Sequence, residues 1–448
     1  MRRLGSTTVM WVIAAIALVA IAVWPSYVHR SADAARASSL PTPAPVAQDY
    51  VGRDRVIAFW ERAENEHHPG DMLSPSKLSA EYLQRYRERG DIGDVLRAMH
   101  MAELSSRAQP YGNAAAEVDL GSALVALHRF KEALSVTKHV ESYQPNDPAM
   151  LVREASVDLE LGRYGDAKKI VDGLNRSRRT GGEDAGLDTL LTRYDELTGH
   201  LARARERFVR TTAYANAQFS VSAQPRAWFY FRSGELAFEA GDNAGAVEYE
   251  REALRTFPNY SEANRALARV ACATHQWQAC LDAAKASAEV VPYPEVLGYE
   301  ADAQRALGDP ASAAQTDALI HTIERIGNAQ RVSDRLLAIY YSEHGENLDD
   351  AYRIATRELA VRDDIFTEDT LAWCAAMAGR WDEARARIAK ATRYGTENAL
   401  LDYHAGAIAL HFGDRAAARA WLEKALALNP QFHAVYADDA RARLAQLK

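Results

Sequence analysis

The chain of 448 residues contains little of several things, and each absence excludes a class of protein. Three cysteines are too few for a disulfide-stapled scaffold. The 53 Lys and Arg do not outnumber the 61 Asp and Glu, and the net charge of −8 argues against a nucleic-acid binder, which usually presents a basic face. A single long apolar run excludes a polytopic membrane protein. With 48% hydrophobic and 25% charged residues, the composition is that of a folded globular chain.

The motifs of common catalytic and cofactor sites are missing as well. The sequence has no G-x-S-x-G nucleophile elbow, no Gly-rich phosphate loop ending in Lys and no H-E-x-x-H zinc motif. His67 and His68 are adjacent, but neighbouring side chains point apart on a helix. We interpret the pair as a solvated helix end before Pro69. We therefore expect no catalytic residues, no metal and no cofactor, and a protein that is not an enzyme.

The N-terminus carries the pattern of an export signal. Arg2 and Arg3 precede an uncharged, apolar run over residues 9–24. We expect residues 1–30 to form a signal anchor in a bacterial inner membrane, with a cleaved signal peptide as the alternative. Basic residues favour the cytoplasmic side, so the body of the chain would lie in the periplasm, or be secreted after cleavage. The use of nine Lys against 44 Arg is typical of GC-rich bacterial genomes.

Residues 31–49 are rich in Pro, Ala and Ser. This composition predicts an extended, solvated linker that holds the folded body away from the membrane.

A repeat of 34 residues runs through most of the chain. A small residue, an aromatic residue nine positions later and an alanine three positions further recur as Gly121, Phe130 and Ala133, as Ala155, Tyr164 and Ala167, and as Ala372, Trp381 and Ala384. Glycine marks a turn inside the units, and proline ends several of them. Each unit is predicted to form two antiparallel helices, because small residues allow a close approach and proline cannot continue the second helix.

The pattern resembles the tetratricopeptide repeat, of the kind found in exported or membrane-anchored bacterial proteins. Its hallmarks here are Leu120-Gly121, Phe130, Ala133 and Pro145 in one unit, and Gly379, Trp381, Ala384 and Ala391 in another. The units are 76–109, 114–147, 148–181, 185–218, 227–260, 261–293, 294–327, 332–364, 365–398 and 399–432. The resemblance implies an all-α fold over 76–432, a right-handed α-solenoid of about ten helical hairpins, with capping helices within 50–75 and 433–448.

Two cysteines flank the turn of one predicted hairpin. Cys272 and Cys280 could form a disulfide in an oxidising compartment. Alternatively, Cys280 fills a slot for a small apolar residue. The predicted separation of two helical turns favours the second interpretation, since a disulfide needs Cα atoms within about 7 Å. Cys374 is predicted to be a core residue.

The concave groove of the solenoid is the candidate binding surface. By the family pattern, positions 2, 5, 9 and 12 of each first helix face this groove. The candidates are Trp228, Phe231, Glu235 and Phe238 in one unit, Arg265 and Arg269 in the next, and Tyr340, Trp373 and Tyr403 in later units. Aromatic residues and arginine dominate binding hot spots, so these residues are predicted to contact a protein or peptide. The alternative is that Trp228 and Phe238 fill an irregular junction with the preceding unit.

Together these patterns predict a non-enzymatic scaffold in the bacterial envelope that binds a protein or peptide partner in its groove. It would contact the membrane only through its N-terminal segment and would bind no nucleic acid. The alternative is an assembly or accessory subunit of an envelope export or polysaccharide secretion machine.

Overall fold

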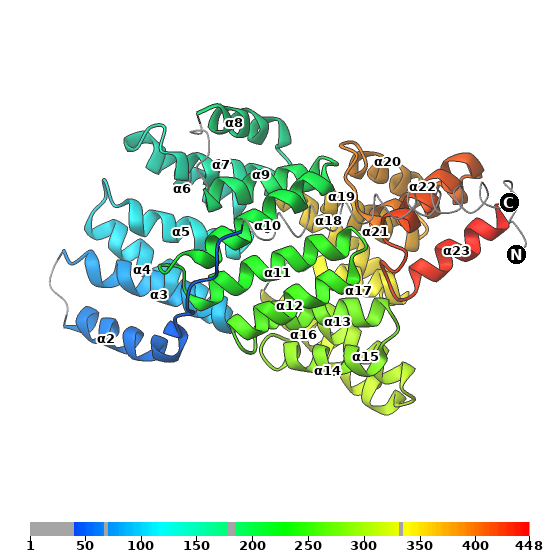
Figure 1. Cartoon of the computed structure of the whole chain (residues 1–448), viewed down its shortest axis with the longest axis horizontal. Coiled ribbons are helices and arrows are strands. Elements are labelled where there is room, and N and C mark those ends of the chain that lie inside the picture. The colour runs from blue at the N-terminus through cyan, green and yellow to red at the C-terminus, as the bar shows by residue number, and fades with distance from the viewer. Residues whose placement is uncertain (1–39, 67–69, 178–183, 331–334, 448) are drawn as a thin grey trace, which may run out of the picture.

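A computed structural model describes residues 40–66, 70–177, 184–330 and 335–447 of the chain. These residues form helices and connecting loops, and the described ranges contain no β-strand. Consecutive helices pair as antiparallel hairpins that stack in sequence order (Figure 1). The expected all-α solenoid of ten helical hairpins is confirmed.

The hairpins are α3 (Leu73–Arg89) with α4 (Ile92–Ala108), α5 (Ala114–Ala126) with α6 (Phe130–Tyr143), α7 (Pro148–Glu160) with α8 (Tyr164–Ser177), α9 (Ala185–Leu197) with α10 (Leu201–Ala217), α11 (Ala223–Glu239) with α12 (Asn243–Thr256), α13 (Ser261–Ala273) with α14 (Trp277–Ala288), α15 (Pro294–Ala306) with α16 (Pro310–Gln330), α17 (Arg335–His344) with α18 (Leu348–Val361), α19 (Ile365–Met377) with α20 (Trp381–Ala391), and α21 (Ala399–His411) with α22 (Arg415–Leu428). The short η1 (Asp49–Gly52) and α2 (Arg53–Asn65) precede them, and α23 (Tyr436–Gln446) follows.

The last hairpin shows how the local sequence produces these units. The Asn398 side chain accepts a hydrogen bond from the backbone N–H of Leu401 and so caps α21. Gly413, with φ of +75°, reverses the chain in the left-handed conformation that glycine adopts readily. Gly406 lets the helices approach so closely that an added Cβ would lie 2.8 Å from the Leu422 side chain. Small residues at this position therefore set the spacing between the two helices.

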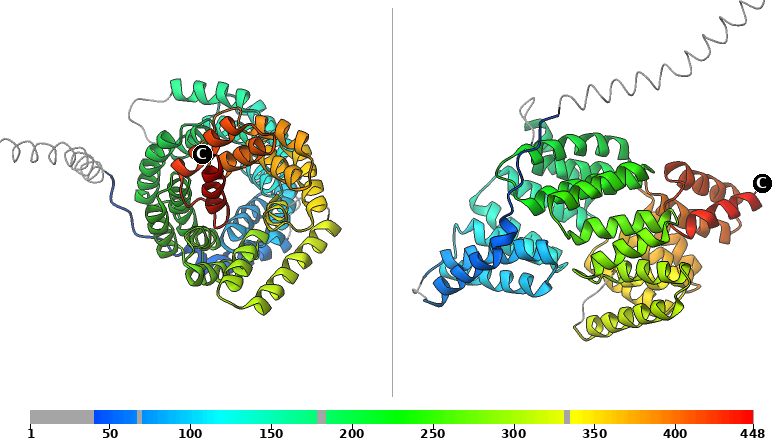
Figure 2. Two further views of the ribbon diagram at one scale, coloured as in Figure 1. Left: turned by 90° about the vertical axis from the view of Figure 1, so that its right-hand side faces the viewer. Right: turned by 60° about the horizontal axis from the view of Figure 1, so that its bottom comes forward.

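The solenoid closes on itself, so that early hairpins contact late ones. Seen along its long axis, it forms a ring of hairpins (Figure 2). The Thr396 hydroxyl donates a hydrogen bond to the carbonyl of Leu197 (2.6 Å), and the backbone N–H of Ile365 donates to the Tyr164 hydroxyl (3.0 Å). Such bonds join residues about 200 positions apart and fix the curvature of the ring.

Glycines at the early turns make this closure possible. Gly162 has φ of +74°, and a Cβ at this position would overlap the carbonyl oxygen of Asp363. Gly241 has φ of +76°, and its added Cβ would lie 2.6 Å from the carbonyl oxygen of Leu428. Glycine is therefore needed at these two positions for two reasons: the turn has a left-handed backbone, and another backbone segment packs where a Cβ would lie.

The segment before η1 differs from the expected linker. The backbone N–H of Ala44 donates to the Asn216 carbonyl (2.9 Å). The fully buried Arg226 donates to the carbonyls of Ala44 (2.6 Å), Gln218 (2.6 Å) and Val221 (2.8 Å). The end of the predicted linker is thus docked against the loop between α10 and α11, because a buried guanidinium needs several acceptors at once.

The predicted signal anchor or signal peptide, residues 1–30, lies outside the described residues, as does the first part of the linker. Within the described ranges, no helix is both long and apolar enough to cross a membrane.

Candidate partner-binding lumen

The first helices of the hairpins enclose a space that we call the lumen. It contains two cavities. The N-terminal cavity, about 650 Å³, lies between α3, α11, α13 and the loop before α15. The central cavity, about 700 Å³, lies between α9, α11, α13, α15, α17, α19 and α21 and the chain between α22 and α23. Arg232 and Glu235 of α11 line both cavities, so the two are neighbours along one wall.

Seven of the nine groove residues predicted from the sequence come together in the lumen. The N-terminal cavity is lined by Trp228, Phe231, Glu235 and Arg265, and the central cavity by Glu235, Phe238, Arg269 and Tyr340. Phe231 and Phe238 are only 6% and 4% exposed, so only a small part of each ring is accessible to a ligand.

Arginines of α13 cover the aromatic rings of α11. The Arg269 guanidinium lies 4.3 Å from the centre of the Phe238 ring, and its Nη2 is 2.6 Å from Glu235 Oε1. The guanidinium of Arg265 lies 5.7 Å from the Phe231 ring. Cation–π contact and ion pairing thus act together on each arginine, which holds both guanidinium groups in place on the lumen wall.

The acids on this wall differ in how well their charge is compensated. Burial raises the pKa of Glu239 to about 7, although Arg269 opposes the shift and the Asn398 amide donates to Glu239 Oε2 (2.6 Å). Burial also acts on Glu196, but Arg193 and Arg232 outweigh it and hold the pKa of Glu196 below its usual value. The wall therefore combines a firmly ionised carboxylate with one that titrates near neutral pH.

Trp228 also packs at the junction with the preceding hairpin, as the alternative interpretation of this residue predicts. Its ring packs edge-on against Phe208 of α10 (centroids 6.1 Å apart) and Phe229 (5.2 Å). Trp228 remains half-buried, so it contributes both to this junction and to the wall of the N-terminal cavity.

Trp373 and Tyr403 are covered by the C-terminal helix and do not line the cavities. Their exposed fractions are 6% and 1%. The Tyr436 ring of α23 stacks on Tyr403 (centroids 4.7 Å apart), and its hydroxyl accepts a hydrogen bond from Trp373 Nε1 (3.2 Å). The two residues lie where the repeat pattern puts them, but the chain's own capping helix occupies that part of the groove.

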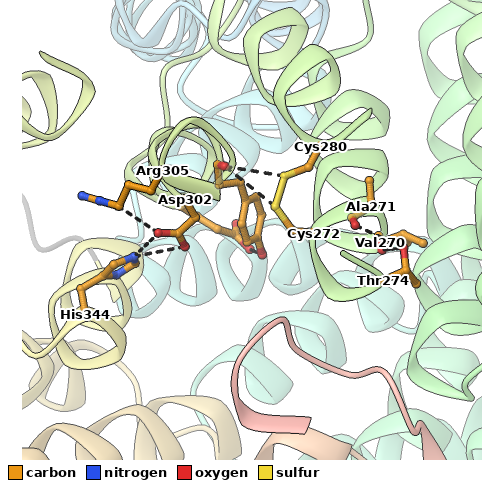
Figure 3. The surroundings of a disulfide bond; sticks show 10 residues. Val270, Ala271, Cys272, Thr274, Cys280, Asp302, Arg305 and His344 are labelled. Atoms are coloured by element: carbon orange, nitrogen blue, oxygen red, sulfur yellow. Dashed lines mark hydrogen bonds and ion pairs between the residues drawn. A yellow bond between two sulfur atoms is a disulfide. The ribbon is translucent and has the colours of Figure 1, made fainter. Parts of the chain in front are cut away.

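The structure contains the disulfide that the sequence analysis disfavoured. Cys272 and Cys280 are joined across the turn between α13 and α14, with Cα atoms 5.2 Å apart (Figure 3). The expected separation was wrong because Cys272 belongs to the last turn of α13 and Cys280 to the first turn of α14. Cys374 is buried and free, as predicted, and burial raises the pKa of its thiol to about 12.

The opposite side of the central cavity carries a charged cluster that the sequence analysis missed. His344 Nε2 lies 3.1 Å from Asp302 Oδ1, and Arg305 donates to the same oxygen (3.0 Å; Figure 3). Burial alone would lower the pKa of His344, but Asp302 raises it to about 9, so the imidazole is protonated at neutral pH. A periodic signal exists for part of the lumen, since Glu235 and Arg269 occupy the same position in consecutive units. Asp302 occupies this position in the following unit, 294–327, whereas His344 is four positions further along in its own unit, 332–364.

Within the described ranges, no cluster of three or more His, Cys, Asp or Glu residues is arranged to hold a metal ion.

Comparison with known proteins gives a likeness of fold only. No protein-family model matches the chain, and no curated protein matches it. Among solved structures, it is similar to a chain of the "Crystal structure of APC/C hetero-tetramer Cut9-Hcn1", with 14% sequence identity and a TM-score of 0.44. The match covers 89% of this chain and 70% of that one.

Proposed function

We propose that this protein is a non-enzymatic scaffold that binds a protein or peptide partner in its lumen. The observation that carries the proposal is the central cavity, where the first helices of seven hairpins converge. A volume of about 700 Å³ is within the range of sites that bury a compact ligand or a few residues of a peptide. Phe238, Tyr299 and Phe366 are among its lining residues, and aromatic residues are enriched at binding hot spots.

The charges of the central cavity favour binding over catalysis. An enzyme could also contain a polar cavity lined by several acids. Here, however, the acids are engaged: Glu196 with Arg193 and Arg232, Glu235 with Arg269, Asp302 with His344 and Arg305, and Asp369 with His404. Paired side chains in fixed positions can orient a ligand by hydrogen bonds. Glu239 differs, because its pKa of about 7 would suit a general acid or base, but it too is held, by the Asn398 amide (2.6 Å) and beside Arg269 (3.8 Å).

A place in the bacterial envelope is the second part of the proposal. It is supported by Arg2 and Arg3 before the apolar run 9–24, and by the Cys272–Cys280 disulfide, since disulfides persist mainly in oxidising compartments. We propose an inner-membrane anchor with a periplasmic body, and release into the periplasm after cleavage as the alternative. A periplasmic reporter fused after Lys448 should be active and a cytoplasmic one inactive. The reverse result would refute the location.

The partner can be captured by crosslinking. A photoreactive amino acid at the half-buried Leu400, which lines the central cavity, should crosslink a partner in envelope extracts. Adding Phe366→Ala with Trp277→Ala should abolish the crosslink, because both rings line the same cavity.

The matched control is Phe412→Ala, which removes an exposed ring outside both cavities and should leave the crosslink intact. Equal crosslinking by all variants, with their helix content unchanged, would refute the lumen as the binding site. Capture of a synthase or porin would identify the accessory-subunit alternative.

A further inference from the structure

Aromatic side chains from several elements line the N-terminal cavity. Tyr86 of α3, Trp228 of α11 and Tyr293, which precedes α15, are half-buried, so part of each side chain remains accessible. Phe231 and Tyr260 also line the cavity and are more deeply buried, with exposed fractions of 6% and 3%. Aromatic rings around a volume of about 650 Å³ favour a ligand that has flat, apolar faces.

The charged side chains around this cavity are paired with one another or with their neighbours. The ion pairs are Arg232 with Glu196 (3.0 Å), Glu235 with Arg269 (2.6 Å) and Glu262 with Arg265 (2.9 Å). The remaining charged residue of the lining, Arg87, is exposed to solvent, where its charge is screened. A charged ligand would have to compete with an existing ion pair, so the cavity favours a neutral one.

The lining nevertheless keeps hydrogen-bonding capacity for a ligand. A carboxylate accepts and a guanidinium donates more hydrogen bonds than a single ion pair uses. Gln224, only 4% exposed, is held by two long hydrogen bonds: Nε2 donates to the Tyr260 hydroxyl (3.4 Å), and Oε1 accepts from Gln84 Nε2 (3.5 Å). Because hydrogen bonds of this length are weak, the amide of Gln224 can exchange them for shorter ones to a ligand.

Two kinds of neutral ligand pack on aromatic rings in this way, a proline-rich peptide and a sugar. Proline has no N–H, so a proline-rich segment mainly accepts hydrogen bonds and would leave the carboxylates of Glu235 and Glu262 without a donor. A sugar hydroxyl both donates and accepts, and the C–H face of a pyranose ring is apolar. The combination of aromatic rings, carboxylates and guanidinium groups therefore favours the sugar.

We propose that the N-terminal cavity binds a short, neutral oligosaccharide. Its sugar rings pack on Tyr86 and Trp228. Its hydroxyls form hydrogen bonds with Gln224, Glu262 and Arg265. This inference goes beyond the partner proposed for the central cavity and does not depend on it.

An oligosaccharide microarray probed with the full chain tests this inference. The protein is kept in a detergent without a sugar headgroup, because an alkyl glycoside would itself compete for the cavity. The array carries neutral oligosaccharides of different linkages, uronic-acid oligosaccharides of the same lengths, and decaproline. Neutral oligosaccharides should bind, and uronic-acid oligosaccharides should bind more weakly, because the cavity supplies no free counter-ion for their carboxylates.

Two results of the array would overturn the proposal. One is binding to no neutral oligosaccharide. The other is binding to decaproline alone, which would assign the cavity to a proline-rich peptide.

Calorimetric titration with the neutral oligosaccharide that binds best then locates the site. Trp228→Ala and Tyr86→Ala remove rings from two different helices, and each should weaken binding by about tenfold. The matched control is Trp421→Ala, which removes a half-buried tryptophan of α22 outside both cavities and should bind like the wild type. Circular dichroism checks that each variant keeps its helix content, and the crosslink from Leu400 should persist in Trp228→Ala. Equal affinity of all variants for the oligosaccharide would overturn this cavity as its site.

Discussion

The contact between Gly162 and Asp363 predicts a position at which a single methyl group weakens the closure of the superhelix. Gly162 and Gly379 are turn glycines of two hairpins, with φ of +74° and +76°. An alanine at 162 would overlap the carbonyl oxygen of Asp363, whereas an alanine at 379 would meet nothing within 4 Å. Because the backbone strain is the same, the difference between Gly162→Ala and Gly379→Ala isolates the closure contact.

The expected magnitude follows from the two contributions. A left-handed backbone costs an alanine about 1 kcal/mol at either position. Only Gly162→Ala also pushes two backbone segments apart, and overpacking of this kind costs about 1–3 kcal/mol. Separation of the segments would weaken the ion pair of Arg362 with Glu160 (2.9 Å). We therefore expect Gly162→Ala to lower the free energy of unfolding by about 1–3 kcal/mol more than Gly379→Ala does.

Urea unfolding followed by circular dichroism gives the global comparison, and amide hydrogen exchange gives the local one. Repeat proteins can unfold in parts, so exchange at the Ile365 amide, which donates to Tyr164, is the more direct measurement. Gly308→Ala, at φ of +84° with nothing within 4 Å, is a second control. Equal exchange and equal midpoints in all three variants would refute the role of this contact in closure.

Three further predictions concern single groups. Arg226→Ala should release the segment at 40–48 to proteolysis, because it removes a buried guanidinium that holds three carbonyls; an unchanged digestion pattern would contradict this. Mutation of Cys272 and Cys280 to serine should lower the free energy of unfolding by about 2–3 kcal/mol, because the unfolded chain regains the conformational entropy that the disulfide removes by closing a loop of eight positions. Urea unfolding with and without reductant measures this loss, and an unchanged free energy of unfolding would contradict it. Glu239 has a pKa in the folded state, about 7, above that of an unfolded glutamate, so its contribution to stability falls as pH rises from about 4 to 7. Glu239→Gln should therefore stabilise the protein relative to wild type more at pH 8 than at pH 5 in thermal unfolding, and an equal difference at both would refute this.

The hairpins could be predicted from the sequence, because their signals are local. A small residue such as Gly406 and a turn glycine such as Gly413 lie within one unit and determine its geometry directly. The curvature of the whole solenoid depends on small rotations between units, and no single residue in the sequence indicates the size of these rotations. The contacts of Thr396 with Leu197 and of Arg226 with Ala44 were for that reason invisible in the sequence.

The candidate site was predicted in part for the same reason. The position of Phe238 and Arg269 on first helices placed them on the lumen side. The cover over Tyr403 comes from Tyr436, which lies beyond the last repeat. Asp302 occupies the same repeat position as Arg269, but its partner His344 does not occupy a position that the repeat pattern places in the groove. Repeat position predicts which face a side chain occupies, and it does not predict what else reaches that face.

Closure of the ring also constrains how such a protein can change its length over evolution. The contacts of Tyr164 with Ile365 and of Glu160 with Arg362 span 201 and 202 residues, close to six repeats of 34. An open solenoid can gain or lose a repeat and keep its neighbours satisfied. Here, an inserted or deleted unit between these residues would move every later loop out of register with the turn it meets. The number of hairpins between α8 and α19 is thus set by geometry, and variation in repeat number is expected only outside that interval.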